Sequence, residues 1–358
     1  MGAVSRLAFR APGRVTLIGD HTDYNDGFVL PAAIQLECVV RGRTRDDRIV
    51  RVRSRDAGGG VRLPADGSAA PAAVEPPWGR YVAGVVRTLA ELGRPPVGID
   101  ALVSSSVPRG GGLSSSAALE VSVALALCAA AGFEPELLEL ANACRRAEEI
   151  ATGVPCGIMD QLASLAGRHD HALLIDCRSL EVEPIPVPSS LAVLVVHSGV
   201  PRGLAGSAYA DRRRACEAIA SRLGLAALRD ATPEQVADEP LGRHVVSESA
   251  RVVDAAEALR TGDVDALGPL LVASHASLRD DYRVSTPELD ALVDALVDAG
   301  ALGARLTGAG FGGSVVALAP QEDATAVLES ATTRYRSETG KKPRGLVSRP
   351  ADGAGSLA

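Results

Sequence analysis

Lysine is almost absent from this chain of 358 residues: only Lys341 and Lys342 occur, both near the C-terminus. Genomic base composition is the simplest cause of this bias, but it restricts the chemistry. If residues 1–340 bind a phosphate, its negative charge must be neutralised by arginine, protonated histidine, a helix N-terminus or a metal ion. The chain also has no GxxxxGK[ST] motif, which excludes a phosphate-binding loop of the Walker type.

Features typical of secreted, membrane and nucleic-acid-binding proteins are also missing. The six cysteines form no CxxC pair, so we expect neither a disulfide framework nor a zinc site. The longest strongly apolar stretch, residues 119–131, contains Glu120 and is too short to span a bilayer. Residues 1–10 lack the apolar core of a signal peptide, and a net charge of −7 argues against a nucleic-acid surface. We therefore expect a cytoplasmic protein with no membrane or nucleic-acid partner.

Strand-like and helix-like segments are mixed in both halves of the chain. Apolar residues at helical spacing predict a helix over residues 78–92. Residues 114–131 predict an apolar helix opened by serines, residues 136–152 an amphipathic helix, residues 209–223 a charged helix and residues 324–335 a further helix. Short apolar runs predict strands over 15–18, 28–30, 37–43, 48–53, 99–104, 172–176, 191–197 and 314–319. Residues 57–77, rich in glycine and proline, predict a surface loop. A cluster of prolines near residue 187 predicts the join between two α/β or α+β domains, residues 1–187 and 188–358.

The most informative segment is PRGGGLSSSA at residues 108–117, between a predicted strand and a predicted helix. Its glycines permit positive φ, and successive free N–H groups can form a nest for an anion. The following helix adds its N-terminal N–H groups and dipole, so the segment can bind a triphosphate without lysine. A serine hydroxyl at the helix start can cap the helix or ligate Mg²⁺. A plain turn is the alternative interpretation of such a glycine-rich segment.

A second segment, residues 11–25, concentrates polar groups between apolar flanks. Asp20, His21 and Asp23 follow Gly19 within four residues. Acceptors at this density suit a polyol, whose hydroxyls favour charged acceptors. A solvated turn with Asx capping would also explain the cluster, although the apolar sequence on both sides argues against it.

Two further segments are compatible with a ligand site. In GVPCGIMDQ at residues 153–161, Asp160 lies among apolar residues, which is typical of a catalytic base or a substrate anchor. A helix cap is the alternative for a single aspartate. The glycine-rich residues 307–313, TGAGFGG, predict either a tight turn or a wall where the backbone approaches a ligand.

The four segments described above, taken together with their order along the chain, resemble motifs of the GHMP kinase family. The stretch GRVTLIGDHTDYNDGFVLPAAI at residues 13–34 is similar to a signature of those members that phosphorylate galactose, and residues 108–120 match the family's phosphate loop. Further matching motifs are GVPCGIMDQ, ALLIDCRSLE (172–181), RHVVSES (243–249), SHASLRDDYRVSTPELD (274–290) and TGAGFGG. The resemblance extends from about residue 9 to residue 350, and motifs of this length in this order are highly specific.

The resemblance implies an α+β fold and a reaction. We expect an N-terminal α/β domain and a ferredoxin-like α+β C-terminal domain, with the active site between them. The implied reaction transfers the γ-phosphate of ATP to the C1 hydroxyl of galactose, with Mg²⁺ as cofactor and the sugar as the small-molecule partner of a monomer. Asp160 would accept the proton of that hydroxyl or orient it, and Arg14 would hold the hydroxyl and neutralise developing charge.

The resemblance also assigns residues to each ligand. The sugar would be held by Asp20, His21, Thr22, Asp23, the backbone of Gly157, and Tyr209. The phosphates would be wrapped by Gly110, Gly111, Gly112, Leu113, Ser114, Ser115 and Ser116. Trp78 and Tyr81 would lie near the adenine, and Ser116 and Glu148 would ligate Mg²⁺.

The chain departs from the family pattern at three positions. Thr16 stands where the signature usually has asparagine, Asp20 where it has glutamate, and Ser314 where cysteine usually follows TGAGFGG. Because Asp20 is shorter than glutamate by one methylene, a kinase for a related sugar, such as an amino sugar or another aldose, stays an alternative. A non-catalytic sensor of galactose and ATP is the second alternative, and the presence of both Arg14 and Asp160 favours an enzyme over it.

Overall fold

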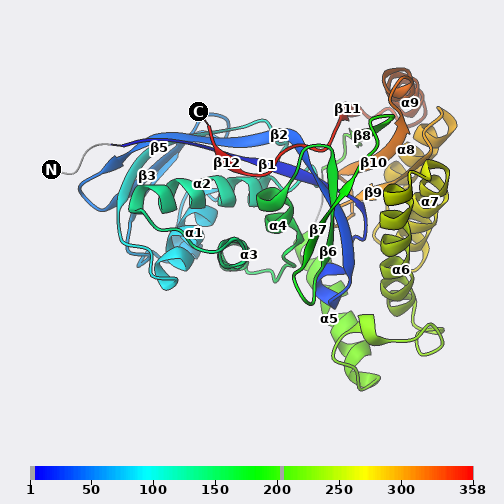
Figure 1. Cartoon of the computed structure of the whole chain (residues 1–358), viewed down its shortest axis with the longest axis horizontal. Helices are drawn as coiled ribbons and strands as arrows, with labels where there is room; N and C mark the ends of the chain where they lie inside the picture. Colours follow the sequence, from blue (N-terminus) through cyan, green and yellow to red (C-terminus); the bar gives the residue numbers. More distant parts are fainter. Residues whose placement is uncertain (1–4, 202–204, 358) are drawn as a thin grey trace.

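The computed structural model describes residues 5–201 and 205–357, which form an eight-stranded and a four-stranded sheet (Figure 1). The larger sheet has the order β12-β1-β2-β5-β3-β4, and β6 and β7 extend from β2. Its strands are β1 (Arg6–Ile18), β2 (Phe28–Arg45), β3 (Ile49–Ser54), β4 (Gly60–Pro64), β5 (Gly98–Ser105), β6 (His171–Asp176), β7 (Val182–Pro186) and β12 (Gly355–Ser356).

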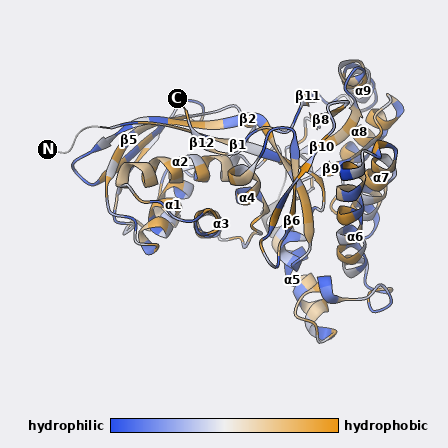
Figure 2. Cartoon of the chain, viewed as in Figure 1, coloured by the Kyte–Doolittle hydropathy of each residue, from blue (hydrophilic) through white to orange (hydrophobic). Residues whose placement is uncertain are grey.

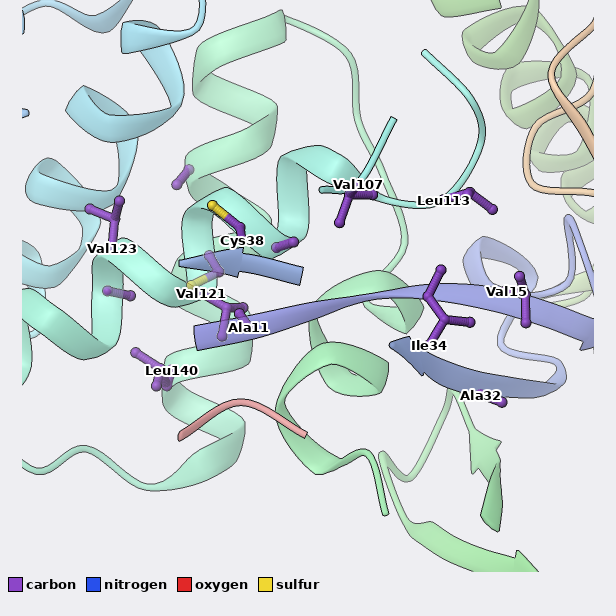
Figure 3. Packing of buried hydrophobic residues seen from close by; sticks show 14 of the residues in the cluster. Ala11, Val15, Ala32, Ile34, Cys38, Val107, Leu113, Val121, Val123 and Leu140 are labelled. Atoms are coloured by element: carbon purple, nitrogen blue, oxygen red, sulfur yellow. The ribbon is translucent and has the colours of Figure 1, made fainter. Parts of the chain in front are cut away.

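Helices cover one side of the larger sheet, as Figure 1 shows. They are α1 (Gly79–Glu91), α2 (Ser115–Ala131), α3 (Leu137–Thr152) and α4 (Met159–Ala166). Helix α2 is apolar around most of its circumference, which is typical of a buried helix, and it packs against β1, β2, α1 and α3. Figure 3 shows its Val121 and Val123 beside Ala11 of β1, Cys38 of β2 and Leu140 of α3. The glycine-rich segment at residues 108–114, which leads into α2, is therefore attached to the centre of this core.

The smaller sheet has the order β11-β8-β10-β9, and all its pairings are antiparallel. Its strands are β8 (Leu191–His197), β9 (Gly303–Thr307), β10 (Ser314–Pro320) and β11 (Arg344–Ser348). The accompanying helices are α5 (Ala205–Arg222), α6 (Pro240–Thr261), α7 (Val264–Asp280), α8 (Pro287–Asp298) and α9 (Ala324–Thr339). In Figure 2, α6 and α7 carry both hydrophobic and hydrophilic residues, as expected of helices with one solvent-facing side. In chain order these strands are arranged 4-1-3-2, the ferredoxin-like arrangement.

The α+β class is confirmed, and so are most of the predicted elements; for example, β8 and α2 differ from prediction by at most one residue. Three predictions were wrong. Residues 57–77 are not only a loop, because β4 pairs antiparallel with β3 and buries Val61 and Leu63. The strands predicted at 28–30 and 37–43 are one continuous strand, β2. Strand β1 begins at Arg6, because a register shift between Pro12 and Arg14 accommodates the proline.

The chain changes from the larger to the smaller sheet between β7 and β8, next to residue 187. The division into residues 1–187 and 188–358 stays our proposal, because β12 returns from the C-terminal end to pair with β1. Among the described residues, no helix is both long and apolar enough to cross a membrane.

Candidate active site

A cavity of about 270 Å³ lies where the two halves of the chain meet. The segment after β1 and the connection between α3 and α4 line it from the N-terminal half, while α5 and the loop after β9 line it from the C-terminal half. Seven predicted site residues contribute to its wall besides the metal candidate Glu148: Arg14, Asp20, His21, Asp23, Gly157, Asp160 and Tyr209. The structure thus brings together residues that are up to 195 positions apart, from Arg14 to Tyr209.

Arg14 and Asp160 form an ion pair in this cavity, in which the arginine side chain is 6% and the aspartate side chain 26% exposed. The Nε and Nη2 groups of Arg14 lie 2.7 and 2.6 Å from Oδ1 of Asp160. The hydroxyl of Ser114 donates to the other oxygen, Oδ2, at 2.5 Å. Burial lowers the pKa of Arg14, but the charge of Asp160, followed by that of Asp20, outweighs this effect and the pKa is raised overall. The guanidinium is therefore a permanent positive charge beside an oriented carboxylate.

Asp20 is held by two groups of the C-terminal half. Its Oδ1 accepts a hydrogen bond from the backbone N–H of Gly308 at 3.0 Å, and its Oδ2 lies 2.8 Å from Nη2 of Arg305. Burial raises the pKa of Asp20, and the charges of Arg305 and Arg14 oppose this effect. Because both oxygens are engaged, the position of Asp20 is fixed by β9 and the loop that follows it.

Asp23 lies against the backbone of Gly157. A Cβ atom at Gly157 would lie 1.7 Å from Oδ2 of Asp23, so only glycine allows this close approach. Burial, followed by the charges of Asp160 and Asp20, raises the pKa of Asp23 to about 7. Asp23 is therefore a carboxyl group that can change its protonation state near neutral pH.

His21 lies in a cluster of aromatic side chains. Its Nδ1 is 2.9 Å from the hydroxyl of Tyr24, which in turn is 2.7 Å from the hydroxyl of Tyr282. The rings of Tyr282 and Tyr209 lie 4.7 and 5.7 Å from its own. Burial, followed by the nearby His244, lowers the pKa of His21 well below its ordinary value. A neutral imidazole on an aromatic support can donate or accept one hydrogen bond in a fixed direction.

Thr22 is the predicted sugar residue that does not line the cavity. Its hydroxyl lies 2.7 Å from the backbone carbonyls of both Gly19 and Phe28, and its side chain is fully buried. These contacts close the turn that presents Asp20, His21 and Asp23. The structure therefore places Thr22 as a support of the turn, because a buried hydroxyl satisfied by local carbonyls cannot also reach a ligand.

The glycine-rich segment before α2 adopts the positive φ angles that its glycines permit. Gly110, Gly112 and Ser114 have φ angles of 69°, 84° and 55°. The side chain of Arg14 donates to the carbonyl of Gly112 at 2.7 Å, and its backbone N–H donates to that of Leu113 at 3.2 Å. The same arginine thus contacts both Asp160 and the loop.

A second cavity of about 500 Å³ lies beside this loop. Trp78, Tyr81, Gly110, Ser115 and Ser116 line it, while Gly111, Gly112, Leu113 and Ser114 are buried beneath. Arg109 and Arg344 stand on its wall, so arginine supplies its positive charge, as the scarcity of lysine requires. The N–H of the Trp78 indole donates to the carbonyl of Gly58 at 3.1 Å, which orients that ring.

Ser116 and Glu148 meet where the two cavities adjoin. The hydroxyl of Ser116 donates to Oε1 of Glu148 at 2.7 Å, and Nε2 of Gln161 donates to Oε2 of Glu148 at 2.7 Å and to Oε2 of Glu120 at 3.1 Å. Burial, followed by the charge of Asp160, raises the pKa of Glu148 to about 7. A hydroxyl and a carboxylate in contact are oxygen ligands of the kind that Mg²⁺ prefers.

Sequence reasoning missed the residues that support Asp20 from behind. Arg305 is fully buried on β9 and donates to the carbonyls of Thr16 and Leu17 at 3.1 and 3.3 Å. Glu248 on α6 accepts from the N–H of Gly19 at 3.0 Å. The Nε2–H of His244 donates to the carbonyl of Asp20 at 3.1 Å. The motif RHVVSES contained two of the three, but nothing in the sequence indicated what they contact.

Comparison with known proteins decides the family. Models described as the N-terminal domain of GHMP kinases, the C-terminal domain of GHMP kinases and the galactose-binding signature of galactokinases match residues 80–168, 255–337 and 2–44. A protein of Roseiflexus sp. (strain RS-1) named galactokinase is 45% identical over 371 residues, which cover 99% of this chain and 94% of the relative. The chain belongs to the GHMP kinase family.

Solved structures of this family agree in fold. A crystal structure of Lactococcus lactis galactokinase complexed with galactose matches with a TM-score of 0.92 and 32% identity, over 99% of this chain and 95% of that one. Methanococcus jannaschii mevalonate kinase matches with a TM-score of 0.71 and 19% identity, over 97% and 99% of the two chains. The second likeness concerns the fold alone.

Proposed function

We propose that the protein is a galactokinase that transfers the γ-phosphate of ATP to the C1 hydroxyl of galactose. The observation that carries this proposal is the ion pair of Arg14 and Asp160 in a cavity that Asp20, His21 and Asp23 also line. The galactose-binding signature over residues 2–44 and the 45% identical relative named galactokinase support galactose as the sugar. We assign the enzyme to the cytoplasm, where ATP is available.

Arg14 and Asp160 would act on the attacking hydroxyl. A hydroxyl placed beside Asp160 can transfer its proton to a carboxylate oxygen or be oriented by it for in-line attack. Arg14 contacts both Asp160 and the carbonyl of Gly112, so its charge lies between the sugar cavity and the phosphate loop. It can therefore neutralise the negative charge that develops on the transferring phosphoryl group.

The residues present also fit a magnesium–nucleotide complex. Ser116 and Glu148 would hold Mg²⁺, which neutralises charge on the phosphates when it is bound. Gln161 keeps the carboxylate of Glu148 in place through a hydrogen bond of 2.7 Å. Trp78 and Tyr81 would lie against the adenine in the second cavity, and the N–H groups of the loop from Gly110 to Ser116 would receive the phosphates.

The shorter side chain of Asp20 is the feature that favours a second candidate, a kinase for a related sugar. We propose to test both with purified protein, Mg-ATP and a panel of aldoses, amino sugars and uronic acids, with ADP release as the readout. Galactose should give the highest turnover, and glucose should be poor. Robust turnover of another sugar with galactose at background would reject galactose as the substrate. Binding of galactose without any ADP release would instead favour a sensor.

A further inference from the structure

The hydroxyl of Ser314, at the start of β10, donates to the backbone carbonyl of Gly111 at 2.6 Å. Ser314 is fully buried, and its strand belongs to the smaller sheet, whereas Gly111 belongs to the phosphate loop of the N-terminal half. The hydroxyl of a serine is a stronger donor than the thiol of a cysteine. The hydrogen bond therefore depends on serine at this position.

Three consecutive carbonyls of the loop accept hydrogen bonds from outside it. Ser314 donates to Gly111, the side chain of Arg14 donates to Gly112, and the backbone N–H of Arg14 donates to Leu113. In a trans peptide the C=O and the following N–H point in opposite directions. Holding these carbonyls therefore directs the next three N–H groups, those of Gly112, Leu113 and Ser114, away from the donors.

We infer that Ser314 is a positioning residue for nucleotide phosphates: it fixes the first of these peptides so that the loop presents its N–H groups to the anion. The inference rests on the proposed function in that the anion is the phosphate chain of ATP. Without the hydroxyl, the buried carbonyl of Gly111 loses its donor, and the peptide can turn over and point a carbonyl at the phosphates. An oxygen lone pair in place of an N–H donor weakens anion binding.

The test compares Ser314→Ala and Ser314→Cys with a matched control, Ser348→Ala. Ser348, at the end of β11, is also a buried serine, and its hydroxyl donates to Oε1 of Gln35 at 2.6 Å, away from the phosphate loop. Dissociation constants for Mg-ADP and for galactose are measured by calorimetry, together with the melting temperature of each variant. Ser314→Ala should weaken Mg-ADP binding about tenfold, which corresponds to the lower part of the range for an unsatisfied buried polar group, and should leave galactose binding unchanged.

Ser314→Cys should fall between wild type and alanine in its affinity for Mg-ADP. Ser348→Ala should lower the melting temperature and change neither dissociation constant. Equal Mg-ADP affinities in wild type and both Ser314 variants, with active wild-type enzyme, would overturn the positioning role and leave the proposed function intact. Weakened Mg-ADP binding in Ser314→Ala, combined with no phosphorylation of galactose by wild type, would support the positioning role and reject the proposed substrate.

Discussion

The two cavities of the site differ in what forms them: side chains form most of one, and backbone forms much of the other. The cavity that we propose for the sugar, called the sugar cavity below, is lined by buried charged side chains, among them Asp20 and Arg14, which are only 2% and 5% exposed. The cavity that we propose for the nucleotide depends on the backbone of a glycine-rich loop and on the partly exposed Ser115, Ser116 and Tyr81. A buried carboxylate needs a partner to offset its desolvation, whereas a backbone nest needs its peptides held in one orientation.

This difference determines which substitutions should affect the binding of each ligand. Asp20 is supported by Arg305, which is 285 positions away in the sequence, so the sugar cavity depends on contacts across the whole chain. The phosphate loop is supported by hydrogen bonds to its carbonyls from Arg14 and Ser314. We therefore expect substitutions behind the sugar cavity to change stability and sugar affinity together, and substitutions behind the loop to change nucleotide affinity.

Substitution of Asp160, which lines the sugar cavity and contacts Ser114 of the glycine-rich loop, should have the largest effect on turnover. Asp160→Asn keeps the size and hydrogen-bonding ability of the side chain, so both ligands should bind, but the rate should fall by roughly 10²–10⁴-fold if the carboxylate acts as a general base. Turnover, a galactose titration and a melting curve measure this. Asp263→Asn is the control, because Asp263 caps α7 through the N–H of Ala266. In the structure Asp160 lies inside α4 and does not cap it, so equal, near-wild-type turnover in the two variants would reduce Asp160 to a structural partner of Arg14 and Ser114.

Substitution of Arg305 should affect galactose binding and leave Mg-ADP binding unchanged. Arg305→Met leaves the carboxylates of Asp20 and Glu248 without their buried partner, and should lower the free energy of unfolding by about 3–5 kcal/mol. Arg305→Lys keeps a charge but cannot reach Thr16, Leu17 and Asp20 together, so it should fold with weaker galactose binding and unchanged Mg-ADP binding.

Arg334→Met provides the control for Arg305. Arg334 pairs with Asp298 and Glu338 on the surface, where its side chain is 44% exposed, and such pairs contribute at most about 1 kcal/mol. Chemical denaturation measures the free energy of unfolding, and calorimetry measures the affinities for galactose and Mg-ADP. The comparison between the two cavities would be wrong if Arg305→Lys weakened Mg-ADP as much as galactose.

The smallest effect should be a pH dependence of galactose binding through Asp23. The pKa of Asp23 is about 7 in the free protein, and a sugar hydroxyl that donates to it favours the ionised form. Affinity should therefore fall as pH decreases below 7, about tenfold per unit, and level off above 7. For stability the sign is opposite: because folding raises this pKa from 3.8, stability decreases as pH rises from about 4 to 7.

Calorimetric titrations of galactose between pH 5.5 and 8.5, without nucleotide, measure the dependence. Asp23→Asn should bind more weakly and should lose the part of the slope that Asp23 causes. The lowered pKa of His21 keeps that imidazole neutral in this range, and any slope that is left is assigned to Glu148, whose pKa is also about 7. If the affinity of wild type for galactose were constant across this pH range, the ionisation of Asp23 would not contribute to sugar binding.

The sequence was sufficient to predict the elements and motifs that have a local signal. Helix α3 was predicted within a residue because its apolar spacing is regular, and α2 because its apolar run is long and opens with serines. Strand β8 was predicted because it is a short continuous apolar run. Strands β4 and β7 were missed because each is only five residues long and contains or adjoins glycine or proline. Short strands of this kind are stabilised by pairing with a neighbour, which no local pattern reveals.

The catalytic and ligand-binding roles stay predictions, but the structure explains why their supports could not be found. Arg305 lies in the strand GARLT, which looks like an ordinary sheet strand, and its partners come from β1 and the turn after it. Ser314 was noted only as a departure from cysteine, and its contact with Gly111 joins residues 203 positions apart. Contacts of this range leave no periodicity in a single sequence.

The position of the transferred phosphate tests the central claim most directly. Wild-type protein is incubated with Mg-ATP and galactose, and the products are examined by ³¹P and ¹H nuclear magnetic resonance. The account predicts ADP and one sugar phosphate whose anomeric proton is coupled to phosphorus, because Arg14 and Asp160 are expected to engage the C1 hydroxyl. A phosphate on another hydroxyl of galactose, or ADP with inorganic phosphate and no sugar phosphate, would contradict it.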